Sequence, residues 1–128
     1  MRHLIDAHTI LWAQDDPGKL GREAVRTLQN RSNELLLSAG TIWELSIKVG
    51  LGKLVLGMPF RLWIDQAMKG LGLVLLPIMV DHAEIQATLP WHHRDPFDRL
   101  LAAQSLGEGV PILSADAIFD RYGINRIW

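Results

Sequence analysis

The apolar residues of this chain form short continuous runs that alternate with stretches of helical periodicity. The continuous runs predict strands at residues 4–5, 34–37, 73–76 and 110–113, with a possible edge strand at 126–128. The helically spaced stretches predict helices at residues 7–13, 20–30, 39–49, 60–71, 81–88, 96–106 and 117–121. Strands that alternate with helices indicate a parallel sheet covered on both faces. The expected fold class is therefore α/β, a three-layer α/β/α arrangement in one domain over residues 1–128.

Local signals set the expected ends of two helices. Asp81 and Glu84 form an Asp-x-x-Glu start, related to the capping box. Gly107 and Gly109 are expected to stop the preceding helical stretch at about Leu106.

Two helical stretches carry more apolar surface than a small domain easily buries. Residues 60–71 form an amphipathic stripe, and residues 42–51 are apolar nearly all round. We therefore expect a homodimer that also takes a partner's helix into an apolar groove.

The composition favours a cytoplasmic protein. The longest apolar run, Leu71–Val80, is interrupted by Gly72 and Pro77 and is far below the roughly 20 residues that span a bilayer. The N-terminus is already acidic at Asp6, unlike a secretory signal. No cysteine is present, which excludes disulfides, thiolate metal sites and thiol catalysis.

The formal net charge of −1 is not that of a dedicated nucleic-acid binder, which is usually basic. If the chain acts on RNA, the contacts must come from a local patch.

Three acidic residues are candidates for chemistry because of where the predicted elements place them. Asp6 follows the first strand and Asp116 the fourth, so both are expected at the carboxyl edge of the parallel sheet, although each also suits a helix N-cap. Glu44 lies on a mostly apolar helix, where it either pairs with Lys48 one turn later or faces a polar site.

The segment Asp95–Gln104 adds a fourth candidate. Asp95 before Pro96 is expected to cap the helix, and Asp98 then lies in the first turn, where the helix dipole favours a negative charge. Four carboxylates meeting at one edge repel one another unless a cation holds them. Oxygen ligands alone suit Mg²⁺ or Mn²⁺ rather than Zn²⁺, and such an ion activates water for hydrolysis of a phosphodiester.

Other residues suggest binding but have simpler explanations. His92-His93-Arg94 lacks a third metal ligand at suitable spacing and is expected to be an exposed loop, where the histidines, Arg94 and Arg99 could contact phosphate. The tryptophans on predicted helices are expected to pack in the core or at an interface: Trp12, Trp43 and Trp63.

Four blocks of sequence resemble the PIN-domain family, and in particular its VapC-type toxins. They are residues 3–12, residues 42–48 with 51–54, residues 95–104, and residues 113–116 with 119–123. Each block alone is weak, but all four occur in order and almost end to end.

This resemblance implies a Mg²⁺-dependent ribonuclease that acts as a toxin, with RNA as substrate and an antitoxin that places a basic side chain in the acidic pocket. By position, the family's acidic residues correspond to Asp6, Glu44, Asp98 and Asp116, with Asp6, Asp98 and Asp116 as metal ligands. Ser114 matches a position where the family often has Thr or Ser. The sequence departs from the family at Ala7, where a Thr or Ser is common.

The sequence also bears on two other functions. A phosphoacceptor domain of the receiver type needs an acidic pair after the first strand and a lysine after the last, and the chain has neither: Asp6 stands alone and Lys69 is the last lysine. A non-catalytic RNA- or protein-binding module on the same fold remains the alternative to a nuclease.

Overall fold

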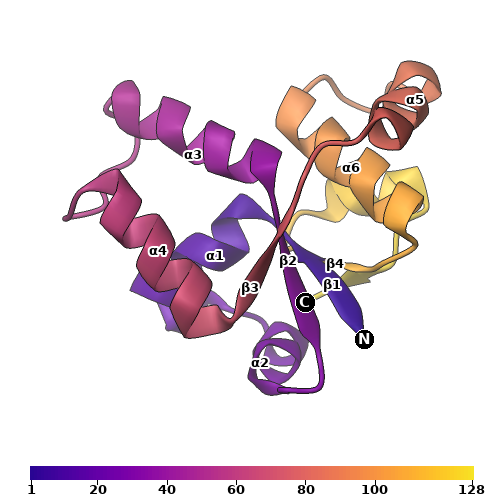
Figure 1. Cartoon of the computed structure of the whole chain (residues 1–128). Coiled ribbons are helices and arrows are strands. Elements are labelled where there is room, and N and C mark those ends of the chain that lie inside the picture. The colour runs from indigo at the N-terminus through magenta and orange to yellow at the C-terminus, as the bar shows by residue number, and fades with distance from the viewer.

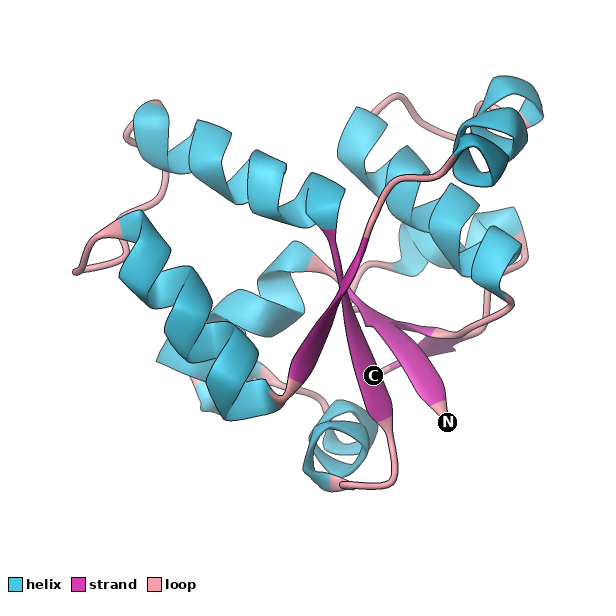
Figure 2. Cartoon of the chain, in the orientation of Figure 1, coloured by secondary structure: helices cyan, strands magenta, loops and turns pink.

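The computed structural model describes residues 1–128 and has a central sheet with helices on both sides (Figures 1 and 2). The strands are β1 (Arg2–Ile5), β2 (Glu34–Ser38), β3 (Leu73–Leu76), β4 (Ile112–Leu113) and β5 (Arg126–Ile127). The α-helices are α1 (Ala7–Asp15), α2 (Arg22–Gln29), α3 (Ala39–Gly50), α4 (Phe60–Leu71), α5 (Val80–Thr88) and α6 (Pro96–Glu108). Two 3₁₀ turns complete the chain, η1 (Pro17–Lys19) and η2 (Ala117–Tyr122). No helix has the length and apolar character needed to cross a membrane.

The sheet is entirely parallel, as predicted, in the order β3-β2-β1-β4-β5. The central strand β1 pairs on both sides, Leu4 lying beside Leu36 of β2 and beside Ile112 of β4. All five carboxyl ends therefore meet at one edge. In Figure 1 this edge lies at the centre, between α1 and α3 on one side and α6 on the other.

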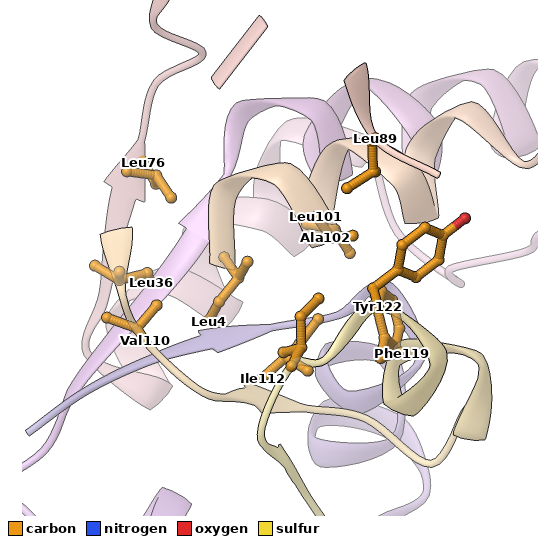
Figure 3. Packing of buried hydrophobic residues seen from close by; sticks show 11 residues of the cluster. Leu4, Leu36, Leu76, Leu89, Leu101, Ala102, Val110, Ile112, Phe119 and Tyr122 are labelled. Carbon is orange, nitrogen blue, oxygen red and sulfur yellow. The ribbon is translucent and has the colours of Figure 1, made fainter. Parts of the chain in front are cut away.

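Alternating side chains of the strands bury two separate cores, one on each face of the sheet. Leu4 and Leu36 point into the first core, where Leu101 and Ala102 of α6 cover them (Figure 3). Their neighbours point into the second core, which α1, α3 and α4 cover, with these buried residues: Ile5, Ala7, Ile10, Leu35, Leu37, Leu45, Trp63, Ile64, Ala67 and Leu73. The predicted three-layer α/β/α fold is confirmed.

The predicted boundaries of two helices are wrong. Helix α5 begins at Val80, and its first turn is capped by His82, whose Nδ1 accepts from Met79 N (3.0 Å), rather than by an Asp81–Glu84 pair. Helix α6 continues through Gly107 and ends at Glu108, with Gly109 as its C-cap at the left-handed φ of 66° that suits glycine. Gly107 is not a helix stop: α5 packs closely there, and a Cβ would approach the side chains of His82 and Ile85 to 3.2 and 3.0 Å.

Two smaller boundaries also differ from the prediction. The second helix starts at Arg22 rather than near Leu20, because η1 and Gly21 precede it. The fourth strand begins at Ile112 rather than Val110, since Pro111 has no N–H to donate to a neighbouring strand.

The two apolar helices behave differently from one another. The stripe on α4 is largely satisfied within the domain, because Trp63 and Ile64 are 2% and 6% exposed. This stripe therefore packs mainly against the core of its own domain. Helix α3 and its C-cap, in contrast, expose Trp43 (67%), Ile47 (38%) and Leu51 (64%), which are spaced four residues apart on one face.

Gly40 allows α3 and α6 to lie close together. A Cβ at this position would collide with the Leu100 side chain, whereas a Cβ at Gly50, on the same helix, would meet nothing within 4 Å. We expect Gly40→Ala to lower the free energy of unfolding by about 1–3 kcal/mol through overpacking. Chemical denaturation measures this difference.

Gly50→Ala is the matched control, because it makes the same change on the same helix without a collision. It should leave stability unchanged or raise it by up to about 1 kcal/mol, the difference in helix propensity. Equal effects of the two substitutions would contradict the close approach of α3 and α6.

Candidate active site

The carboxyl edge of the sheet holds a cleft of about 210 Å³. Its wall includes the residue that follows β1, the middle of α3, the start of α6 and the residue that opens η2. The side chains that line it are Asp6, Ala7, His8, Glu44, Lys48, Asp95, Asp98, Leu101 and Asp116. The structure thus brings all four predicted acidic residues to one place and adds a fifth, Asp95, together with His8.

Asp6 is a buried carboxylate held on both oxygens. It is only 7% exposed and caps α1 by accepting from Thr9 N (2.9 Å). The Thr9 hydroxyl contacts the same oxygen at 2.7 Å, and the Ser114 hydroxyl donates to the other oxygen. Because these bonds fix the side chain, its remaining lone pairs are presented in a set direction.

Hydroxyl groups at the carboxylate come from Thr9 and Ser114. Ala7 has no hydroxyl, although the family commonly has Thr or Ser at this position. Thr9, two residues later, reaches Asp6 Oδ1 instead. Ser114 also accepts from Asp116 N (3.0 Å), so one hydroxyl links Asp6 at the end of β1 to the backbone before η2.

Glu44 has both of the roles that the sequence left open. It is 9% exposed, it pairs with Lys48 Nζ at 3.3 Å, and it lines the cleft. Lys48 is the one lysine or arginine of the cleft wall, against five carboxylates.

The start of α6 supplies two carboxylates. Asp95 is the N-cap, as predicted, and accepts from Phe97 N (2.9 Å) and Asp98 N (3.0 Å). Burial raises the pKa of Asp98 from 3.8 to about 6, and the charges of Asp95 and Asp116 add to the increase, while a hydrogen bond with His93 opposes it. The Asp98 carboxylate therefore lies in a site that disfavours its negative charge.

Asp116 also has two roles. Its side chain caps η2 by accepting from Ile118 N (3.0 Å), as predicted, and it lines the cleft. Its influence on the pKa of Asp98 shows that the two carboxylates are close enough to repel each other.

A chain of hydrogen bonds reaches Asp98 from the interior. Arg99 donates to the Tyr122 hydroxyl (3.2 Å), which lies 2.7 Å from His93 Nδ1, and His93 Nε2 lies 3.2 Å from Asp98 Oδ2. With neutral imidazole, the arrangement that satisfies every group has Tyr122 donating to Nδ1, so that Nε2–H donates to Asp98. His93 is thus a positioning residue for this carboxylate.

Two predictions about basic residues need correction. Arg99 cannot contact phosphate, because it is 1% exposed and its guanidinium donates to the carbonyls of Leu89 (3.0 Å) and Pro90 (2.7 Å). The segment His92-His93-Arg94 is not simply an exposed loop, since His93 is half-buried between Tyr122 and Asp98.

Sequence reasoning missed Asp95 as part of the cleft wall and missed His8, and it assigned His93 to phosphate contact rather than to Asp98. The sequence gives a signal for His8, because it lies two residues after Asp6 at the start of a helix. No such signal exists for His93, whose contacts depend on the packing of η2 against α6.

The oxygen-rich cleft suits a hard divalent cation held partly through water. No three His, Asp or Glu side chains converge closely enough to enclose an ion by themselves. Mg²⁺ does not require this, since it keeps several waters and binds proteins through one or two carboxylates. Two carboxylates fit that manner of binding: that of Asp6, which hydrogen bonds hold in place, and that of Asp98, whose negative charge the site disfavours.

The chain is a single α/β domain with a parallel sheet and an acidic cleft at the carboxyl edge of that sheet. The PIN domain model matches residues 3–125, and the chain belongs to this family. The family resemblance expected from the sequence is confirmed. A comparison with curated protein sequences gives no significant match.

Solved structures with a similar fold include three bacterial proteins. VapBC2 from Rickettsia felis, bound to a promoter DNA fragment, matches with a TM-score of 0.77 at 13% identity, over 98% of this chain and 97% of that one. VapBC-1 from nontypeable Haemophilus influenzae matches with a TM-score of 0.68 at 15% identity, over 98% and 96%. FitAcB from Neisseria gonorrhoeae matches with a TM-score of 0.66 at 18% identity, over 97% and 95%.

The raised pKa of Asp98 predicts a pH-dependent effect of Asp98→Asn on the metal-free protein. Between about pH 4 and pH 6 the folded protein binds a proton at Asp98 more tightly than the unfolded chain, so wild type loses stability as the pH rises through this window. The asparagine variant does not pay this cost. Relative to wild type, its free energy of unfolding should therefore rise by about 1–3 kcal/mol between pH 4 and pH 7.5.

Chemical denaturation of both proteins in chelator at the two pH values measures this change. The other titrating groups largely cancel in the difference between the two proteins. A difference that is independent of pH would mean that Asp98 only stabilises the first turn of α6 through the helix dipole.

Proposed function

We propose that this protein is a Mg²⁺- or Mn²⁺-dependent endoribonuclease that acts as the toxin of a toxin–antitoxin pair. The observation that carries the proposal is the convergence of Asp6, Glu44, Asp98 and Asp116, with Asp95, around one cleft. PIN domains of VapC toxins are generally nucleases that use divalent metal ions, and the fold and the cleft of this chain agree with that activity.

The residues that would hold the ion are Asp6, Asp98 and Asp116, in part through coordinated water, because the three carboxylates do not enclose an ion by themselves. A bound divalent ion supplies charge neutralisation at the phosphodiester and lowers the pKa of a coordinated water. The protein contributes rigidity: Thr9 and Ser114 fix the Asp6 carboxylate, and His93 orients that of Asp98.

Glu44 and Lys48 serve the other side of the cleft. Their 3.3 Å ion pair keeps a cation beside the carboxylates and leaves Glu44 with lone pairs toward the cleft. We assign to Glu44 the orientation of the attacking water, since a general-base histidine is not needed in such a site.

The alternative is a non-catalytic binding module. A module that only binds RNA gains nothing from five carboxylates beside a single lysine, because they repel phosphate and one another. The acidic cleft therefore favours the nuclease.

The test is cleavage of RNA with Mg²⁺ or Mn²⁺. We expect cleavage with either ion and none with chelator. Asp6→Asn and Asp98→Asn should each lower the rate by at least about 100-fold, because a lost ligand misplaces both the ion and the water. Glu23→Gln, an exposed carboxylate paired with Arg26 on α2, is the control and should cleave as wild type does. Full activity of Asp6→Asn or Asp98→Asn in metal-limited buffer would contradict the assignment.

The partner surfaces that we propose are the exposed apolar residues. One is the α3 face formed by Trp43, Ile47 and Leu51, which suits an amphipathic helix of an antitoxin. The other is the edge strand β3, where Val74 and Leu75 are 44% and 48% exposed and which could pair with a second copy. The solved VapBC and FitAcB neighbours support an antitoxin partner for this chain.

Sedimentation of the purified chain tests the homodimer, and a strictly monomeric protein would contradict it.

A further inference from the structure

Trp91 lies in an unusual position for a large aromatic residue. It is 74% exposed, yet the Arg99 guanidinium lies over its ring, 3.7 Å from the ring centroid. An exposed tryptophan that is fixed by a buried cation has lost most of its freedom before anything binds.

The Arg99 guanidinium that stacks on this ring is held in place by hydrogen bonds. Arg99 donates to two main-chain carbonyls and to the Tyr122 hydroxyl, and in the amide orientation that satisfies both groups Gln86 accepts from its Nε (3.1 Å). None of these partners is a carboxylate, so the positive charge is not neutralised locally. Its field supports the ring electrostatically as well as sterically.

Beside the ring is an open cavity of about 690 Å³, lined by Trp91, His92, His93 and Arg94. Its volume is within the range of small-ligand sites, about 300–1,000 Å³. Arg94 is exposed and makes no ion pair, so its charge is free for an anion. An aromatic platform with a free cation is the combination that binds a base and its phosphate.

The cavity adjoins the acidic cleft. His93 lines the cavity and contacts Asp98 of the cleft (3.2 Å), and Asp95, which also lines the cleft, follows Arg94 directly in the chain. A strand of RNA whose phosphodiester lies at the carboxylates can therefore reach this loop.

We infer that Trp91 and Arg94 form a nucleobase subsite, in which an unpaired base of single-stranded RNA stacks on Trp91 while Arg94 contacts the adjacent phosphate. The inference rests on the proposed function and names how that site holds its substrate. It also answers how a chain of net charge −1 with a strongly acidic cleft binds RNA, namely through a local patch beside the cleft.

Binding of a fluorescein-labelled single-stranded oligoribonucleotide of mixed sequence, measured by anisotropy in chelator, tests the subsite without cleavage. Stacking on an aromatic side chain should make Trp91→Leu bind roughly 10-fold or more weakly, and Trp91→Phe within about threefold of wild type. Arg94→Gln should reduce the slope of log K against log salt concentration by about 0.7, the value for one phosphate contact with a single strand.

Leu62→Ala is the matched control. Leu62 is an exposed apolar side chain (48%) on α4, and it lines neither the cleft nor the cavity. The variant should bind RNA within about twofold of wild type, because this side chain offers no base a position beside the cleft. Equal losses in Leu62→Ala and Trp91→Leu would overturn the subsite.

Two further measurements report directly on where the base lies. RNA should quench the tryptophan fluorescence of wild type more than that of Trp91→Phe, because stacking places the base on the indole. An oligoribonucleotide series with an abasic site at each position in turn should bind wild type about 10-fold more weakly at one position, and Trp91→Leu should ignore that position.

The outcomes separate the subsite from the function. Metal-dependent cleavage by wild type, together with unchanged RNA binding by Trp91→Leu, would overturn the subsite and leave the nuclease standing. No RNA binding and no cleavage by wild type would overturn both.

Discussion

The mutual repulsion of carboxylates at one edge of a parallel sheet is the constraint on which the rest of this site depends. Parallel strands bring their carboxyl ends together, so Asp6 after β1 and Asp116 before η2 lie near each other although both are negatively charged. Burial is the main cause that raises the pKa of Asp98 to about 6, and the charges of Asp95 and Asp116 add to the increase. A fold that keeps such a cluster does so for a ligand that reverses the cost, and a divalent cation is the simplest one.

Hydroxyl groups contact one of these carboxylates directly, and a buried arginine is linked to another through two intervening side chains. Thr9 and Ser114 hold Asp6, and the line Arg99–Tyr122–His93 ends on Asp98. Figure 3 shows Tyr122 with its ring in the first core and its hydroxyl directed out of it. One aromatic residue therefore joins the packing of the core to the alignment of the site.

Arg99 ties together two surfaces that the substrate would use. On one side it supports the hydrogen bonds that orient Asp98, and on the other its guanidinium holds the Trp91 ring. Because the same side chain acts on both, the geometry of the cleft and that of the loop before α6 are not independent.

Much of the fold could be predicted from the sequence because hydrophobic periodicity identifies elements well. The meeting of Asp6 and Asp116 follows from the rule that the ends of parallel strands share an edge, whereas Glu44 and Asp98 reach the cleft from α3 and α6. Helix ends were less accurate: Gly107 reads as a helix stop, but the position is a glycine because α5 packs closely against it. The burial of α3 and the contacts of His93 and Arg99 depend on neighbours distant in sequence, so periodicity could not reveal them.

The central claim is that the carboxylates form a divalent metal site, and thermal melts with increasing Mg²⁺ test it most directly. Ligand linkage predicts that Mg²⁺ at 100-fold above its Kd adds about 2.7 kcal/mol to the free energy of unfolding of wild type. The melting temperature of wild type should rise accordingly. The same Mg²⁺ should raise that of Asp98→Asn much less. A wild type whose melting temperature is indifferent to both Mg²⁺ and Mn²⁺ would contradict the account.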